Sequence, residues 1–249
     1  KIMGLATGIH ELDQTLHGLD DNEGEILLFA ARPGQGKTAQ ACSIVKHFAI
    51  VEEYPGDFYS AEMNANQIWS RLVLGAAGID TSKAITGHFG AAELKQIAVW
   101  SKKFQASPIA INGSSHITTA DLRTQVQIAK RTRGIRWIVV DHLHLIKAVG
   151  EAGLKDERQR LVEVMETLQF IKKEYQVVVI LLVQLNRETD RNPGKPPVLA
   201  DLSGSAAIEW YADHIVFLHR EPYFRAWHTL KEETQNLWRE TVQPRRERN

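Results

Sequence analysis

A glycine-rich segment ending in lysine and threonine is the part of this sequence whose residue types point most directly to chemistry. The segment reads Ala31-Arg-Pro-Gly-Gln-Gly-Lys37-Thr38. An apolar run before it, Glu25–Ala30, predicts a buried strand, and apolar residues recur at helical spacing after it, through residues 39–53. Strand, glycine turn, Lys-Thr and helix in this order are typical of a loop that binds nucleotide phosphates. An ordinary glycine turn is the alternative, and the flanking strand and helix disfavour it.

The residue types of this loop suit a bound phosphate group. Gly34 and Gly36 leave room for backbone N–H groups to close around an anion, and the following helix adds the positive end of its dipole. Lys37 supplies a charge for the outer phosphates, and Thr38 offers a hydroxyl to Mg²⁺. Ala31 stands where glycine is usual, and its methyl group is tolerated if its φ is negative. We therefore predict a nucleotide site formed by Arg32, Pro33, Gly34, Gln35, Gly36, Lys37, Thr38 and Ala39.

Polar side chains follow three other apolar runs. Asp141 ends the run Trp137-Ile-Val-Val-Asp141, where it is placed to hold Mg²⁺ through water. Glu62 follows Tyr59-Ser-Ala, and it suits either polarising an attacking water or stabilising the first turn of the next helix. Gln184 ends a further run and suits a hydrogen bond to the γ-phosphate or to the attacking water, although a lone strand-end glutamine is usually only structural.

The elements that must position these residues alternate between strand-like and helix-like patterns. Strands are predicted at Glu25–Ala30, Asp57–Ala61, Pro108–Asn112, Arg136–Asp141, Val177–Gln184 and His214–His219. Helical spacing of apolar residues connects most of them. Strands that are apolar throughout and joined by helices predict a mostly parallel sheet with helices on both faces, an α/β fold. Such sheets bind ligands at the carboxyl ends of their strands, so we expect the polar residues to gather there.

Composition narrows the class of protein further. The 249 residues carry 30 basic and 30 acidic side chains, so a globally basic nucleic-acid binder is not indicated, although local basic loops remain possible. Cys42 is the only cysteine and cannot form a disulfide within the chain, which fits the reducing cytoplasm. The sequence has no apolar run of 18 residues, so no membrane span is expected. Because it begins at Lys1 and ends in mid-pattern, we expect a fragment of a longer protein.

Taken in series, these motifs resemble the C-terminal ATPase domain of DnaB-type replicative helicases, a hexameric RecA-like motor with a P-loop. The resemblance covers nearly all of the chain, so we expect one motor domain over residues 1–249, with a leading segment near a linker at 1–20 and a C-terminal extension toward the neighbouring subunit at 222–249. The motifs that carry it are Gly8-Ile-His-Glu-Leu-Asp13, Ala30-Ala-Arg-Pro-Gly-Gln-Gly-Lys-Thr38, Ser60-Ala-Glu-Met63, Asp141-His-Leu-His-Leu145, Gln184-Leu-Asn-Arg187 and Ala207-Ile-Glu209.

The resemblance implies a role for each candidate residue. Lys37 and Thr38 would contact ATP and Mg²⁺, Asp141 would serve Mg²⁺, Glu62 would be the catalytic base and Gln184 the γ-phosphate sensor. In the tail, Arg246 and Arg248 match the family's pair of basic residues that reach the nucleotide of the neighbouring subunit. A solvated basic tail is the alternative. The family also implies single-stranded DNA, a homohexameric ring, primase and a helicase loader as partners.

The sequence departs from the family in the loop that touches single-stranded DNA. Asp201-Leu-Ser-Gly-Ser-Ala206 lacks the arginine and glutamate that are common there, which leaves backbone contacts from Ser203 and Gly204. Basic residues nearby would then supply the charge that DNA phosphates require. The candidates for DNA binding are Arg158, Arg187, Lys195, Ser203 and Gly204.

The function expected from these features is a helicase motor that couples Mg-ATP hydrolysis to translocation on single-stranded DNA and to duplex unwinding. One alternative is a RecA-like ATPase ring or helicase loader that remodels protein without unwinding, and the altered DNA loop favours it slightly. A strand-exchange accessory protein is a further alternative, which the absence of zinc-ribbon cysteines disfavours. A metal site built on the pair His142 and His144 has little support, since no third ligand is evident.

Overall fold

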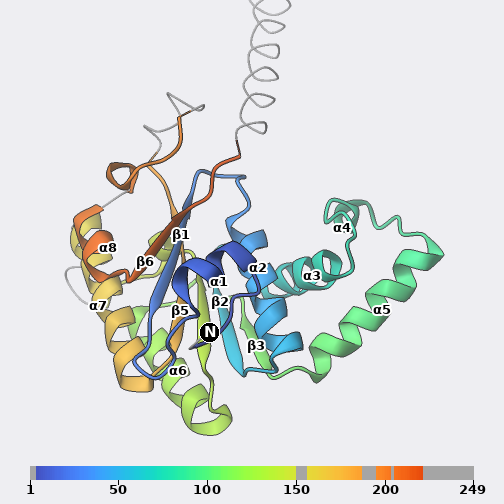
Figure 1. Ribbon diagram of the computed structural model, residues 1–249, viewed down its shortest axis with the longest axis horizontal. Coiled ribbons are helices and arrows are strands. Elements are labelled where there is room, and N and C mark those ends of the chain that lie inside the picture. The colour runs from blue at the N-terminus through green and yellow to red at the C-terminus, as the bar shows by residue number, and fades with distance from the viewer. Residues whose placement is uncertain (1–3, 150–155, 187–194, 203–204, 221–249) are drawn as a thin grey trace, which may run out of the picture.

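A parallel β-sheet of six strands forms the centre of the protein (Figure 1). The computed structural model describes residues 4–149, 156–186, 195–202 and 205–220. The strands stand in the order β3-β2-β4-β5-β1-β6, and every paired neighbour is parallel. Their bounds are β1 Ile26–Ala31, β2 Gly56–Ser60, β3 Ile109–Asn112, β4 Trp137–Asp141, β5 Val178–Gln184 and β6 His214–Phe217. The predicted α/β class with a mostly parallel sheet is therefore confirmed, and each predicted strand is present within three residues of its expected bounds.

Helices cover both faces of the sheet, so two separate cores form (Figure 1). One face carries α6 (Thr119–Arg133), α7 (Glu157–Tyr175) and α8 (Ser205–Tyr211). The other carries α2 (Lys37–Lys46), its π-helical continuation His47–Val51, α3 (Ala65–Ala76) and α5 (Ala91–Ala106). The short helices α1 (His10–Leu16) and α4 (Lys83–Thr86) have no buried residues.

The alternation of side chains along each strand explains why both faces are apolar. In β1, Leu28 packs into the core beneath α6 and α7, whereas Leu27 and Phe29 pack into the core beneath α2 and α3. All six side chains of β1 are buried. Successive side chains of a strand point to opposite faces, so a strand covered on both sides is largely apolar. This requirement accounts for the continuous apolar runs in the sequence.

Particular residues determine where α3 begins and how closely β2 packs against β4. Asn64 and Gln67 form a reciprocal capping box at the start of α3, with N···O distances of 3.0 Å in both directions. Gly56 begins β2 directly against the indole of Trp137, and a Cβ at this position would lie 2.1 Å from Trp137 Cε2. The indole N–H of Trp137 donates to the Tyr54 carbonyl at 3.0 Å, so the ring is fixed as well as buried.

Three helices and one boundary differ from what sequence periodicity predicts. The spacing of apolar residues predicts a helix through residues 39–53, but α2 already begins at Lys37 and gives way to π-helix after Lys46. The short helices α1, α4 and α8 were not predicted. Of the expected segments, 1–20 is described from residue 4 onward, and 222–249 lies outside the described residues.

Candidate nucleotide-binding site

The glycine-rich loop joins the end of β1 to the start of α2. Ala31 is the last residue of β1 and does not have a positive φ, so its methyl group is accommodated. Gly34 and Gly36 have φ values of 75° and 98°, which L side chains rarely adopt. Gly36 is also the N-cap of α2, and no atom lies within 4 Å of the place where its Cβ would stand. The loop thus leaves open space beside the N–H groups of the first turn of α2, where an anion is favoured.

Lys37 extends back across the carboxyl ends of two strands. Its Nζ donates to the Ala31 carbonyl at 3.1 Å, and the same carbonyl accepts from the Leu185 N–H at 3.2 Å. Burial lowers the pKa of Lys37, while Glu62 and Asp141 act to raise it. The charges of both carboxylates therefore act on the ammonium group, at the edge where a phosphate group would compete for it.

Thr38, at the start of α2, contacts Asp141, at the end of β4, although β5 lies between β1 and β4 in the sheet. Thr38 Oγ1 donates to Asp141 Oδ2 at 3.0 Å. Asp141 is only 1% exposed, and its Oδ1 is buried without a hydrogen-bond partner in the described part of the chain. Burial, followed by the charge of Glu62, raises the pKa of Asp141 to about 6, although the Thr38 hydroxyl opposes the shift. A hydroxyl and an unsatisfied carboxylate oxygen side by side fit a hard divalent cation such as Mg²⁺, which takes oxygen ligands.

Glu62 follows β2 at the same edge, because β2 and β4 are neighbours. Ser60 is paired with Asp141 in the sheet, and the Ala61 N–H donates to the Asp141 carbonyl at 2.7 Å. The Glu62 side chain is 55% exposed, with Oε2 at 3.9 Å from His142 Nε2. Glu62 thus lies at the open side of the phosphate loop, where a water molecule has access.

Gln184 completes this edge of the sheet. It is the last residue of β5, is partly buried and stands opposite Ala31 in the parallel register. The structure therefore brings together five of the predicted residues at the carboxyl ends of neighbouring strands: Lys37, Thr38, Glu62, Asp141 and Gln184.

Two side chains of the loop reach other segments, which the sequence pattern did not reveal. Gln35 is 3% exposed, and its Oε1 accepts from the Arg220 N–H, just beyond β6, at 2.6 Å. Arg32 is also 3% exposed and donates from Nη2 to the Lys195 carbonyl at 3.4 Å. Their backbones belong to the phosphate loop, while their side chains connect it to the segments that follow β5 and β6. Pro33, Gly34 and Ala39 are exposed.

The two histidines after β4 contact each other. The ring centroids of His142 and His144 are 5.7 Å apart at an interplanar angle of 59°. Burial lowers the pKa of His142, and burial together with the charge of His142 lowers the pKa of His144 to about 4. The described ranges contain no group of three or more His, Cys, Asp or Glu side chains that would hold a metal ion.

The remaining candidates are only partly described. Arg158, in the first turn of α7, and Lys195 are exposed. The other five candidates lie outside the described residues: Arg187, Ser203, Gly204, Arg246 and Arg248.

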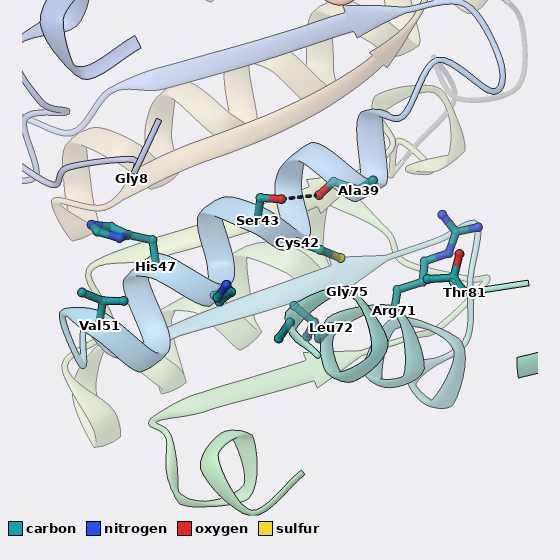
Figure 2. Close-up of a pocket in the computed structure, with 12 residues that line it drawn as sticks. Gly8, Ala39, Cys42, Ser43, His47, Val51, Arg71, Leu72, Gly75 and Thr81 are labelled. Atoms are coloured by element: carbon teal, nitrogen blue, oxygen red, sulfur yellow. Dashed lines mark hydrogen bonds between the residues drawn. The ribbon is translucent and has the colours of Figure 1, made fainter. Parts of the chain in front are cut away.

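A groove of about 420 Å³ runs along α2 and α3 (Figure 2). Figure 2 shows Arg71 near its Ala39 end, with His47 and Val51 toward the other end. Cys42 lines the groove, and burial raises the pKa of its thiol to about 12. A thiol that remains protonated is a poor nucleophile, so Cys42 is not a candidate for catalysis here.

A parallel sheet with helices on both faces, a glycine loop after β1 and a hydroxyl–carboxylate pair that joins the start of α2 to the end of β4 together define the RecA-like P-loop class. The chain belongs to the family described as "DnaB-like helicase C terminal domain", which matches residues 4–248. No helix in the ranges that the structure describes is long and apolar enough to cross a membrane.

Curated relatives and solved structures agree with this assignment. The chain is 32% identical over 224 residues to the replicative DNA helicase DnaC of Bacillus subtilis (strain 168), which covers 90% of this chain and 48% of the relative. It is 33% identical over 227 residues to the replicative DNA helicase DnaB of Haemophilus influenzae, with 90% and 47% covered. The chain thus spans about half the length of the curated relatives it matches.

Among solved structures, a DnaB-like replicative helicase, described with its interactions with primase, superposes with a TM-score of 0.82 at 27% identity. The match covers 90% of this chain and 55% of that one. An ATPase domain superposes with a TM-score of 0.81, also at 27% identity, and the match covers 90% and 78%. The family predicted from the serial motifs is therefore confirmed.

Proposed function

We propose that this chain is the motor domain of a hexameric replicative DNA helicase, which couples Mg-ATP hydrolysis to movement along single-stranded DNA and to duplex unwinding. Family membership supports the proposal, and the curated relatives described above are themselves named replicative DNA helicases. The observation that carries it is the pair Thr38 and Asp141. A buried carboxylate oxygen without a partner in the described residues, beside a hydroxyl, suits a nucleotide-bound Mg²⁺, which takes oxygen ligands.

The other residues at this edge have complementary roles in the proposed reaction. The first turn of α2 and Lys37 would bind the phosphates, and bound Mg²⁺ would neutralise charge on the β- and γ-phosphates. Glu62 would accept a proton from water as the water oxygen bonds to the γ-phosphorus and the bond to the β–γ bridging oxygen breaks. Gln184 would report the presence of the γ-phosphate to the segment after β5. Arg246 and Arg248 would reach the nucleotide of the neighbouring subunit.

The proposed DNA contact is local, since the whole chain has no net charge. Lys195 lies after β5, and Arg32 of the phosphate loop donates to its carbonyl. This contact from the Arg32 side chain to the Lys195 carbonyl offers a route by which nucleotide state would alter the position of basic residues near DNA. Arg158 and Arg187, with backbone groups of Ser203 and Gly204, are the other proposed contacts. Primase and a helicase loader are proposed partners by family.

A loader or remodelling ATPase is the alternative, which the relatives named replicative DNA helicases do not favour. The loop Asp201-Leu-Ser-Gly-Ser-Ala206 has no basic side chain, so its grip on DNA phosphates is weaker than an arginine would allow. Two assays on the same preparation separate the candidates: ATP hydrolysis with and without single-stranded DNA, and unwinding of a forked duplex. A helicase is expected to show DNA-stimulated hydrolysis and unwinding. Hydrolysis without unwinding would support the loader.

A further inference from the structure

Glu62, the proposed catalytic base, has a largely exposed side chain that must be oriented toward the attacking water. Its side chain is 55% exposed, and within the described residues its one ion-pair contact is to His142. A glutamate side chain has several rotatable bonds, so fixing it in one orientation costs conformational entropy. A rigid neighbour that holds one carboxylate oxygen would leave the other oxygen oriented toward the attacking water.

His142 is such a neighbour. It follows Asp141 at the end of β4, its side chain is only 9% exposed, and its ring packs against that of His144. Its Nε2 faces Glu62 Oε2 at 3.9 Å, whereas its Nδ1 is buried without a hydrogen-bond partner in the described part of the chain. A buried N–H without an acceptor costs more than a buried lone pair, so the proton of the neutral ring is favoured on Nε2.

We infer that His142 is a positioning residue for hydrolysis, whose Nε2–H orients the Glu62 carboxylate toward the attacking water. The inference rests on the proposed role of Glu62 as the base. The distance of 3.9 Å closes to a hydrogen bond by a small rotation of the exposed glutamate or is spanned by one water. Catalytic hydrogen bonds are often long without substrate and shorten when it binds.

The test compares two amides that differ by one methylene. In His142→Gln the amide nitrogen reaches about as far as Nε2, whereas in His142→Asn it reaches only to the region of Nδ1. Turnover and binding of a fluorescent ATP analogue with Mg²⁺ are measured for both variants and for His142→Leu. We expect His142→Asn and His142→Leu to lose kcat by about tenfold or more with KM little changed, since small misplacements of catalytic groups cost up to about 10²-fold. His142→Gln should retain most of the turnover. The exposed His88→Leu is the control.

A double-mutant cycle with Glu62→Gln separates positioning from a merely structural effect. If His142 acts through Glu62, His142→Asn should reduce turnover no further once Glu62 has lost its charge. An equal additional loss in that background, or equal turnover of His142→Asn and His142→Gln, would overturn the inference. Normal turnover of the His142 variants beside an inactive Glu62→Gln would overturn the inference alone. Normal turnover of Glu62→Gln would overturn the proposed base and this inference together.

Discussion

Asp141 is buried, and only one of its two carboxylate oxygens accepts a hydrogen bond within the described residues. Thr38 occupies one carboxylate oxygen, and the other has no partner in the described residues. Asp141→Asn keeps the size of the side chain and removes the charge that would serve Mg²⁺. We expect the Mg²⁺ concentration for half-maximal ATP hydrolysis to rise by about tenfold or more in this variant, because a neutral amide holds a divalent cation less strongly than a carboxylate does. Glu157→Gln, at an exposed carboxylate on α7, is the matched control. An unchanged Mg²⁺ titration would count against the metal role.

His144 gives the folded protein a sensitivity to acid that single-residue replacement can remove. Burial and the charge of His142 lower its pKa from 6.5 to about 4, so the folded state resists protonation that the unfolded chain accepts. The unfolding free energy therefore keeps its full value above pH 6.5, and it falls as the pH drops from 6.5 to 4. The full loss is on the order of 3 kcal/mol, from about 1.4 kcal/mol per pKa unit.

Denaturant unfolding of wild type and His144→Gln across this pH range measures the effect. The variant should lose less stability between pH 6.5 and 4 than the wild type, because its side chain does not titrate. His88→Gln, at an exposed histidine, should follow the wild-type curve. Parallel curves for wild type and His144→Gln would show that another group causes the acid sensitivity.

At the scale of elements, the contact between β2 and β4 makes a clear demand on one glycine. A Cβ on Gly56 would lie 2.1 Å from Trp137 Cε2, and this ring is fully buried and hydrogen-bonded. Gly56→Ala is expected to lower the unfolding free energy by about 1–3 kcal/mol through overpacking. Gly75→Ala, within α3, meets no atom within 4 Å and should raise it by about 0.5–1 kcal/mol. Denaturant unfolding of the two variants and the wild type measures both changes. Equal changes in unfolding free energy for the two variants would contradict the packing described for Trp137.

The elements that sequence predicts well are those with long apolar signals. All six strands were predicted because each contains an apolar run, which burial on both faces requires in the central strands and which the partly buried edge strands β3 and β6 also have. The helices α1 and α4 were missed because they bury no residues and so have no apolar stripe to detect. α2 begins at Lys37, two residues before the start predicted from periodicity, because Gly36 caps the helix within the phosphate loop. Periodicity alone therefore misses short exposed helices and their boundaries.

The candidate site likewise has features that the sequence predicts and features that it does not. Lys37, Thr38 and Asp141 were predictable because strand ends of a parallel sheet share one edge. The approach of His142 to Glu62 was not, since it depends on β2 and β4 being neighbours, which the chain order does not specify. The contact from Gln35 to the segment after β6 likewise joins residues far apart in sequence.

At the scale of the whole molecule, the proposed ring makes each site depend on two subunits. Arg248 is proposed to act on the nucleotide of a neighbour, and an arginine supplied in this way contributes on the order of 10³–10⁵ in rate. Lys37→Ala and Arg248→Ala should each be inactive alone. In mixed rings, some interfaces pair an intact phosphate loop with an intact arginine, so hydrolysis should partly return. Mixed rings that form and remain inactive, or full activity of Arg248→Ala alone, would show that the tail does not act in trans.

The most direct test of the whole account replaces one lysine and follows hydrolysis and unwinding together. Lys37→Ala removes the charge proposed to bind the outer phosphates, whereas Lys46→Ala removes the same charge later on α2, where Nζ lies 5.2 Å from the Trp100 ring centroid. DNA-stimulated ATP hydrolysis and forked-duplex unwinding are measured on both variants and the wild type. We expect Lys37→Ala to lose both activities and Lys46→Ala to retain both. Hydrolysis and unwinding at wild-type rates in Lys37→Ala would contradict the account.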